Sequence, residues 1–306
     1  MRYLSRLLTL IFTVAVLCSC EEVIVLDSPN FDHFMVVQAT LTNQKGPQQI
    51  YLSQSQNYFD NSKPLVLSGA SVEVSDDEGN LYIFTENAAK KGTYVWTPKS
   101  ESDVLGKIGR TYKLLVKYTG ESYTSVAKMY RVPPIDSILY QASDASNRQS
   151  GTNKPEVGFD AQFFARDPRG AGDCYRVKFY KNDKLFNETD NLVLMYDSSF
   201  QKGAMADGLL FILPVRRAIS PELYVEKDKI KVELYSISED QFNFYSQARL
   251  ELNNAGLFAR PAANIPTNVV NTNRNSKTQG AGWFGVSAVS TLETVVDPKK
   301  ARTNLK

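Results

Sequence analysis

Short segments in which apolar and polar residues alternate recur along the first half of the chain. Residues 70–75 alternate strictly, which is typical of a β-strand with one buried and one solvated face. The polar residues 77–80 then predict a tight turn, and the apolar residues 81–84 predict the returning strand of a hairpin. The same kind of pattern predicts further strands at residues 34–41, 49–53, 92–96, 112–118 and 122–126. No helical periodicity interrupts these strands, so residues 31–132 are expected to form an antiparallel β-sandwich.

A second β-rich domain is expected over residues 133–298. Pro133 and Pro134 form a stiff exit from the first domain, because proline fixes its own backbone and restricts the residue before it. Predicted strands then follow at residues 135–140, 157–165, 175–180, 209–213 and 229–235. The glycine-rich residues 280–285 predict a turn that leads into a closing strand over residues 286–289.

One helix is predicted within the second domain, near residues 239–254. Ser238 and Gln241 have the spacing of a capping box, which marks the start of a helix. Large apolar residues then recur at helical spacing, namely Phe242, Tyr245 and Leu252. Residues 253–256 end in glycine and supply the stop. We expect this stripe to pack on the second sheet.

Residues 1–19 have the features of a secretory signal peptide: a positive start, an apolar run over residues 7–17 and a small residue before the cleavage position. The apolar run is too short to span a membrane. Leu17, Ser19 and Cys20 are similar to the bacterial lipobox, in which the cysteine becomes the acylated N-terminus. The alternative is an ordinary signal peptide followed by an incidental cysteine.

Lipidation at Cys20 would tether the mature protein to a membrane, because three acyl chains exceed the two signals that stable attachment usually needs. Residues 20–30 would then form a short acidic tether. Glu21 and Glu22 resemble the export signal of bacteria that display lipoproteins on the outside, and a solvated tether is the alternative. Residues 299–306 are expected to form a polar tail.

Charge and cysteine content narrow the class of partner. Loss of Arg2 and Arg6 with the signal peptide leaves 33 of the 35 basic residues against 33 acidic residues, a formal charge of zero. This balance argues against nucleic acid as a partner, because a basic excess is what attracts it. With Cys20 acylated, no intramolecular disulfide is available, and Cys174 is expected to be a small buried apolar residue. The alternative for Cys174 is an exposed redox thiol.

The residues that would support catalysis are sparse. The single histidine, His33, stands at the start of the first predicted strand and is expected to be a solvated edge residue. A Ser-His-Asp or Cys-His arrangement would need His33 and a distant nucleophile, and no Gly-x-Ser-x-Gly elbow is present. Paired carboxylates can hydrolyse glycosides, but the pattern singles out no pair among 33 acidic residues. The chain is therefore predicted not to be an enzyme.

Two motifs bear on metals and cofactors. Residues 76–80 are acidic but lack the spacing of a calcium loop, so a hairpin turn is predicted there. Gly280, Gly282 and Gly285 match part of a dinucleotide-binding fingerprint, but a strand follows them where that fingerprint requires a helix. Zinc lacks its usual Cys and His ligands. No metal and no cofactor is expected.

Three polar loops are candidate contact surfaces, because recognition tends to lie on loops held by a rigid scaffold. They cover residues 54–64, 141–155 and 268–280. The residues predicted to contact a partner are Tyr58, Phe59, Asn147 and Trp283. The alternative for each loop is disorder or plain solvation. Trp96 and Trp283 are also candidate platforms for sugars, and packing in the core or in a turn is the alternative.

Several short segments, taken in order, are similar to those of a known family. They are residues 20–22, 36–42, 64–77, 92–94, 109–114, 132–138, 236–238, 261–268 and 282–285. Together they resemble the Bacteroidota lipoprotein family known as domain of unknown function 4249, over almost the whole mature chain. Residues 271–280 depart from it, since a shorter glycine-rich link is expected there. The first domain also resembles the immunoglobulin-like or carboxypeptidase-regulatory-like modules of bacterial surface proteins.

The resemblance implies a location and a partner but no catalytic residues. It implies an outer-membrane lipoprotein, facing either the periplasm or the cell surface and often encoded beside a TonB-dependent receptor of the SusC-like kind. The leading hypothesis is therefore a non-enzymatic accessory, or substrate-capture partner, of a TonB-dependent transporter. The alternative is a stand-alone surface adhesin that binds a glycan or a protein.

Overall fold

The computed structural model describes most of the chain from residue 33 to residue 302. The described residues are 33–56, 60, 62–144, 155–186, 192–197, 199, 205, 207–210, 222–254, 260–261 and 263–302. The predicted signal peptide, Cys20 and the tether lie outside these residues, as do Tyr58, Phe59 and Asn147. All the strands and helices named below belong to one compact unit formed by residues 32–56 and 63–306. Within this described part, no helix has the length and apolar character needed to span a bilayer.

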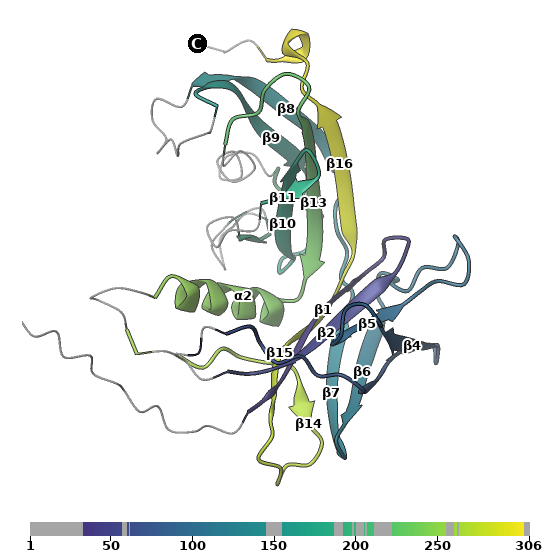
Figure 1. Cartoon of the computed structure of the whole chain (residues 1–306). Coiled ribbons are helices and arrows are strands. Elements are labelled where there is room, and N and C mark those ends of the chain that lie inside the picture. Colours follow the sequence, from purple (N-terminus) through teal and green to yellow (C-terminus); the bar gives the residue numbers. More distant parts are fainter. Residues whose placement is uncertain are drawn as a thin grey trace, which may run out of the picture. The chain divides into compact units, whose positions relative to one another are not determined.

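The larger sheet has nine strands and curls into a nearly closed, barrel-like form (Figure 1). In spatial order its strands are β14 (Val270–Asn271), β7 (Glu121–Lys128), β6 (Thr111–Tyr118), β3 (Ser71–Asp76), β4 (Leu81–Glu86), β5 (Thr93–Trp96), β2 (Gln48–Gln54), β1 (Met35–Thr42) and β15 (Gly280–Ser287). Strand β15, at one edge, contacts β7 and β14 at the other edge, which nearly closes the sheet. The prediction of a mainly β fold is confirmed.

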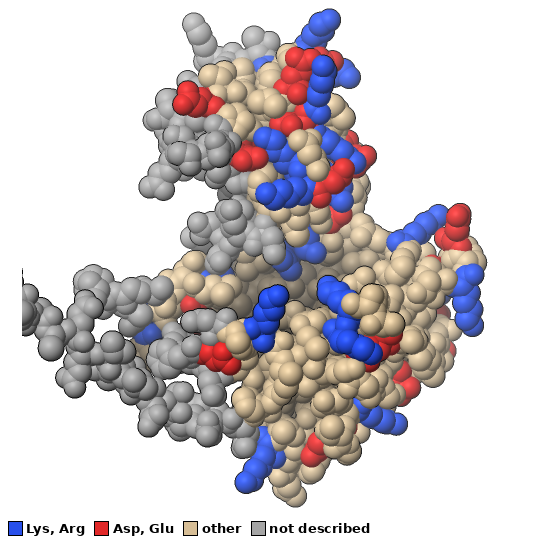
Figure 2. Space-filling model, in the orientation of Figure 1, with Lys and Arg blue, Asp and Glu red and all other residues tan. Residues whose placement is uncertain are grey.

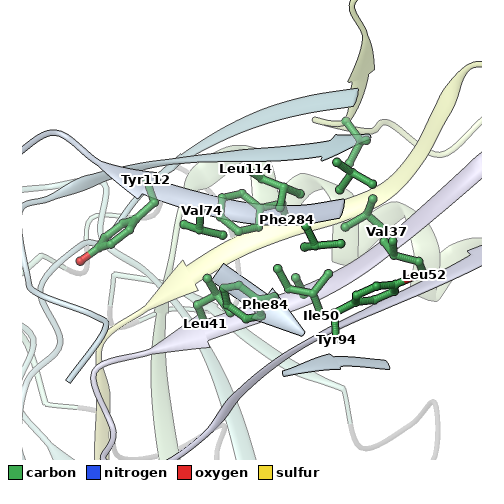
Figure 3. Close-up of a cluster of buried hydrophobic side chains, with 14 of the residues drawn as sticks. Val37, Leu41, Ile50, Leu52, Val74, Phe84, Tyr94, Tyr112, Leu114 and Phe284 are labelled. Atoms are coloured by element: carbon green, nitrogen blue, oxygen red, sulfur yellow. The ribbon is translucent and has the colours of Figure 1, made fainter. Parts of the chain in front are cut away.

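The inward-facing side chains of this sheet form one hydrophobic core. The alternation predicted for β3 is present, since Val72 and Val74 are buried and the residue between them is only half-buried. Figure 3 shows the core side chains converging from several strands: Val37, Leu41, Ile50, Leu52, Val74, Phe84, Tyr94, Tyr112, Leu114 and Phe284. Phe284 belongs to β15 and is fully buried. A strand near the end of the chain therefore completes the core begun by the first strands.

The predicted hairpin at residues 77–80 is confirmed, because β3 and β4 pair in antiparallel register on either side of it. The Asp76 carboxylate accepts hydrogen bonds from the backbone N–H groups of Glu78 (3.0 Å) and Asn80 (2.9 Å). It also accepts one from the Tyr82 hydroxyl (3.1 Å). Burial opposes ionisation of Asp76, but the hydrogen bonds outweigh it and hold the pKa of Asp76 below its ordinary value. The buried carboxylate at the start of this acidic motif thus stabilises a turn.

Two smaller sheets follow in the second half of the chain. Strands β8 (Ile135–Asp144) and β9 (Val157–Ala165) pair with each other. The five-stranded sheet contains β11 (Lys184–Leu185), β10 (Cys174–Lys181), β13 (Lys229–Ile237) and β16 (Val289–Val295) in that order, with β12 (Val193–Tyr196) paired to β10. The short helix η3 (Pro298–Lys300) follows β16. Of the predicted strand at 209–213, the described part reaches only Leu210, which forms an isolated bridge to Arg166.

Helix α2 (Glu239–Leu252) begins as predicted. The Ser238 hydroxyl accepts a hydrogen bond from the Gln241 backbone N–H at 3.1 Å, which caps the helix. Phe242 is buried in a small apolar cluster with residues of β10, β12 and β13. Leu252 was predicted to lie on the same buried stripe, but it is 68% exposed, and that part of the prediction is wrong. The ring contacts of the helix come from its first two turns, so helical spacing alone overstates the length of the buried stripe.

Strands β15 and β16 are separated by a single residue but belong to different sheets. That residue, Ala288, is fully buried, and its backbone N–H donates to the hydroxyl of Ser236 in β13 at 2.9 Å. The Ser236 hydroxyl in turn donates to the Tyr130 carbonyl at 2.8 Å, and the Ser236 backbone N–H donates to the Ala288 carbonyl at 2.9 Å. One buried serine therefore joins three segments. Residues 133–298, which were predicted to form a second domain, therefore supply strands to both the nine-stranded and the five-stranded sheet.

The Ser236→Ala variant is expected to lower the free energy of unfolding by about 1–2 kcal/mol, because it leaves the buried Ala288 N–H without an acceptor. Ser287→Ala is the matched control. Ser287 is also fully buried, but its hydroxyl has no hydrogen-bond partner in the described structure, so its loss should cost less than about 0.5 kcal/mol. Urea unfolding followed by fluorescence compares the two. Equal losses would contradict the joining role of Ser236.

The glycine-rich residues 280–285 form part of β15, so the prediction of a turn there is wrong. They pair in parallel with β1, and Gly282 lies opposite Val37. Gly282 has φ +80°, and a Cβ atom on it would overlap the Val37 carbonyl group. A Cβ atom on Gly285 would lie 2.5 Å from the side-chain amide nitrogen of Gln241 in α2. These glycines allow neighbouring segments to approach the strand closely, and they do not reverse the chain.

Candidate functional site

The outer face of the large sheet carries a row of polar and aromatic side chains across four neighbouring strands. Trp283 of β15 pairs with Gln38 of β1, which also pairs with Tyr51 of β2. Tyr51 in turn pairs with Thr93 of β5. Residues that pair across neighbouring strands point to the same face of a sheet. The alternate residues of these strands fill the core, so this row faces outward.

Part of this row lines an open depression of about 470 Å³, here called the Tyr51 depression. Its lining residues are Gln38, Gln49, Tyr51, Lys90 and Thr93. The two amides can each donate and accept hydrogen bonds, the lysine can only donate, and the tyrosine offers both a ring and a hydroxyl. The volume falls within the range of small-ligand sites. This lining suits a ligand rich in hydroxyl or amide groups.

Thr93 lines this depression, but its hydroxyl oxygen is buried. The residue is 3% exposed, and its hydroxyl has no hydrogen-bond partner among the described residues. A buried hydroxyl without a partner is unfavourable, because it has lost its bonds to water without replacing them. Because this oxygen is closed to solvent, a ligand in the depression would not reach it, and Thr93 adds no hydrogen-bonding group to the surface of the depression.

Trp283, predicted as a contact residue, lies next to the Tyr51 depression in register but is covered by helix α2. It is 8% exposed, and its ring stacks on that of Phe244 with the ring centroids 5.0 Å apart. Trp283 is therefore a packed side chain, which was the alternative to a role as a platform for sugars. Trp96 is half-buried and meets the Tyr82 ring edge to face at 5.6 Å.

The predicted contact loop at residues 268–280 is held against β15 by a side-chain amide. Asn268 donates through Nδ2 to the Phe284 carbonyl at 2.7 Å and accepts from the Phe284 backbone N–H at 3.0 Å. Further along, Asn271 donates to the Thr278 carbonyl at 2.7 Å. Asparagine side chains thus take the place of backbone ladder bonds over part of this loop.

The remaining residues singled out from the sequence have simple surroundings. His33 is exposed, as predicted, and its Nδ1 lies 3.0 Å from the Ser55 carbonyl oxygen. Cys174 is 2% exposed in β10, which confirms the buried apolar role. Among the described residues, no group of three or more His, Cys, Asp or Glu side chains is placed to hold a metal ion. On the face shown in Figure 2, basic and acidic side chains are interspersed.

A second polar cluster, not foreseen from the sequence, lies on one face of β10 and β13. In register, Arg176 pairs with Tyr235, Lys178 with Glu233 and Tyr180 with Lys231. These six residues are here called the Lys178 cluster. The intervening residues of both strands are buried in the core of the second half, so the cluster occupies the opposite face. The sequence alternation was visible in each strand, but the register that joins two segments so far apart was not.

Glu233 holds the middle of the Lys178 cluster and is only 5% exposed. Its carboxylate accepts hydrogen bonds from the Tyr180 hydroxyl at 2.7 Å and the Tyr235 hydroxyl at 2.8 Å, and it pairs with the Lys231 ammonium at 3.1 Å. Burial raises the pKa of Glu233, but these three partners lower it by more, so that it lies below its ordinary value.

Lys178 has no such partner. Its ammonium nitrogen lies 4.2 Å from the centre of the Tyr235 ring and has no hydrogen bond or ion pair within the described part of the chain. Burial lowers the pKa of Lys178 to about 8, and the nearby guanidinium of Arg176 adds to this effect. The cluster thus holds three cations and one carboxylate.

These features define a class: a mainly β protein in which a nearly closed nine-stranded sheet presents a polar depression on its outer face. The comparison with family models then gives the family. The model described as Domain of unknown function (DUF4249) matches residues 21–293. The chain belongs to this family, which confirms the prediction made from the order of its short motifs. The search of curated proteins found no match.

Proposed function

We propose that the chain is a non-enzymatic, lipid-anchored outer-membrane protein that captures substrate for a TonB-dependent transporter of the SusC-like kind. The observation that carries the capture role is the Tyr51 depression, which is open, is lined by two glutamines, a tyrosine, a lysine and a threonine, and has a size suited to small ligands. Four of its five lining residues lie on paired strands of the large sheet, so these groups are held in place before a ligand arrives.

The proposed location rests on the sequence around Cys20 and on the family. The spacing of Leu17, Ser19 and Cys20 favours acylation, and the resemblance is to lipoproteins of the Bacteroidota. An N-terminal lipid would hold the protein at the membrane, where the proposed partner lies. The family resemblance also favours the transporter as partner over an unrelated membrane protein.

We also propose that residues 31–132 form an immunoglobulin-like or regulatory-like β-sandwich. Strand β4 supports this, because its first four residues pair with β3 and its last two pair with β5. It thus passes from one half of the large sheet to the other, as corner strands do between two packed sheets. Strand β15 would be an addition to such a module.

The Tyr51 depression would equally serve a stand-alone surface adhesin that binds a glycan or a protein, and this is the second candidate. A pull-down of the full-length protein from its native outer membrane in mild detergent separates the two. The transporter hypothesis predicts stoichiometric recovery of a TonB-dependent barrel, and loss of both membrane attachment and the barrel in Cys20→Ala. Recovery of the protein alone, from a preparation that keeps other membrane complexes intact, would contradict it and favour the adhesin.

The Tyr51→Ala variant tests the depression itself. We expect it to weaken binding of a neutral oligosaccharide by about tenfold, because an aromatic face and a hydroxyl are both lost. Tyr130→Ala is the control, since Tyr130 is 41% exposed and does not line the depression. An oligosaccharide array identifies the ligand, and calorimetry with full-length protein measures it. If both variants bind every ligand as the parent does, the depression is not the capture site.

A further inference from the structure

We infer that the Lys178 cluster binds an oxyanion, a carboxylate or a phosphate group, through Arg176 and Lys178. The inference does not depend on the proposed function, since neither the lipid anchor nor a transporter enters it. It rests on the charge balance of the cluster and on hydrogen-bond donors that the described structure leaves unused.

The first step concerns charge. Glu233 is the single carboxylate of the Lys178 cluster, and both of its oxygens already have partners in Tyr180, Tyr235 and Lys231. Lys178 lies opposite Glu233 in register but forms no ion pair with it. A partly buried positive charge without a counter-charge is unfavourable, and a bound anion would balance it.

The next cation along β13 does not alter this balance. The Lys229 ammonium lies 3.2 Å from the Asp183 carboxylate and 3.0 Å from the Glu293 carboxylate, and both acidic side chains are exposed. Glu293 also lies opposite Lys231 in register and so borders the Lys178 cluster, but its carboxylate pairs with Lys229. The positive excess is therefore local to Arg176 and Lys178.

The second step concerns donors. Arg176 donates through Nη1 to the Tyr245 hydroxyl at 3.1 Å, but its Nε is buried without a hydrogen-bond partner among the described residues. Because that Nε is closed to solvent, an oxyanion would bind at the outer edge of the guanidinium, through its Nη atoms. Lys178 adds three unused donors. The two residues are on the same face of β10, about 7 Å apart along the strand, so their long side chains can reach one oxyanion.

The third step concerns preorganisation. The Arg176 guanidinium lies 4.7 Å from the centre of the Tyr245 ring, and the Lys178 ammonium lies 4.2 Å from that of Tyr235. Tyr245 is itself fixed by a hydrogen bond from Gln241 at 3.3 Å. Rings thus position both cations before a ligand arrives. Neither cation is fully buried, so an anion from solvent can approach.

The lowered pKa of Lys178 agrees with this geometry. An anion beside the ammonium would favour its protonated form and raise its pKa again from about 8. Among the described residues, the charged or titratable groups beside Lys178 are Arg176 and Tyr180 on β10 and Lys231, Glu233 and Tyr235 on β13, and helix α2 adds Tyr245 next to Arg176. None of them adds a negative charge beyond Glu233.

The test uses the full-length protein in a non-ionic detergent, titrated separately with glucuronate, inorganic phosphate and glucose. Calorimetry should show binding of at least one anion and none of glucose. Lys178→Met should weaken that binding by tenfold or more. Lys229→Met should leave it unchanged, because Lys229 has its own partners. Binding of glucuronate alone identifies a carboxylate site, and binding of phosphate alone identifies a phosphate site.

A second measurement, on the unaltered sequence, guards against a variant that fails to fold. The lysine side chains are labelled by reductive ¹³C-methylation, and the pKa of Lys178 is followed by NMR with and without the anion. An upward shift on adding anion is expected. If neither anion binds up to about 10 mM, or if glucose binds equally well, the inference is overturned.

Discussion

The Gly282→Ala variant is expected to lower the free energy of unfolding by about 2–5 kcal/mol. Gly282 has φ +80°, a conformation that costs a residue with a Cβ atom about 1–2 kcal/mol. The added methyl group would also overlap the Val37 carbonyl group in β1, which cannot rotate away as a side chain could. Overpacking of this kind costs about 1–3 kcal/mol or more. Urea unfolding monitored by circular dichroism measures the total loss in the free energy of unfolding.

Gly69→Ala is the matched control for this prediction. Gly69 has nearly the same backbone angle, φ +82°, but a Cβ atom there would meet nothing within 4 Å. It should therefore show the backbone cost alone, about 1–2 kcal/mol. If the two variants lose the same stability, the close approach of β15 to β1 is not what requires glycine at position 282.

The contrast between β15 and the early strands shows which parts of the fold can be predicted from sequence. The hairpin at residues 77–80 and the cap at Ser238 were predictable, because alternation, turn residues and capping boxes are local signals. The pairing of β1 with β15 joins residues more than 200 positions apart, and glycine has little strand preference. Local patterns carry no information about such a contact.

The Tyr51 depression and the Lys178 cluster show the same limit of prediction from sequence. The sequence analysis placed the candidate contact surfaces on loops, because loops often carry recognition. It selected Trp283 as a contact residue for its aromatic ring. The Tyr51 depression instead forms on strand faces, from Gln38, Tyr51 and Thr93 on three separate strands. Each of these residues is ordinary on its own. Only the register of the sheet brings them together, and register depends on long-range packing.

The Glu233→Gln variant is expected to lower the free energy of unfolding by about 2–4 kcal/mol at neutral pH. It leaves the cations of the Lys178 cluster without their one carboxylate, and breaking a buried pair by removing one partner is strongly destabilising. The amide also replaces one acceptor oxygen by a donor, so Lys231 or the two tyrosine hydroxyls lose a partner. Glu293→Gln is the control, since Glu293 is 54% exposed and its pair with Lys229 should contribute less than about 1 kcal/mol.

The pH dependence of the stability difference between the parent chain and Glu233→Gln distinguishes the effect of the Glu233 charge from the effect of its packing. The folded-state pKa of Glu233 lies below its ordinary value of 4.5, so the unfolded chain takes up the proton first as the pH falls. The stability supplied by the ionised carboxylate is therefore fully present above about pH 5 and is lost as the pH falls through the folded-state pKa. The gap between the parent chain and Glu233→Gln should be constant from pH 5 to pH 7 and should narrow below pH 4.5. A stability difference that stays constant down to pH 3 would contradict this. It would mean that Glu233 acts through its shape and hydrogen bonds, and that its negative charge does not stabilise the three neighbouring cations.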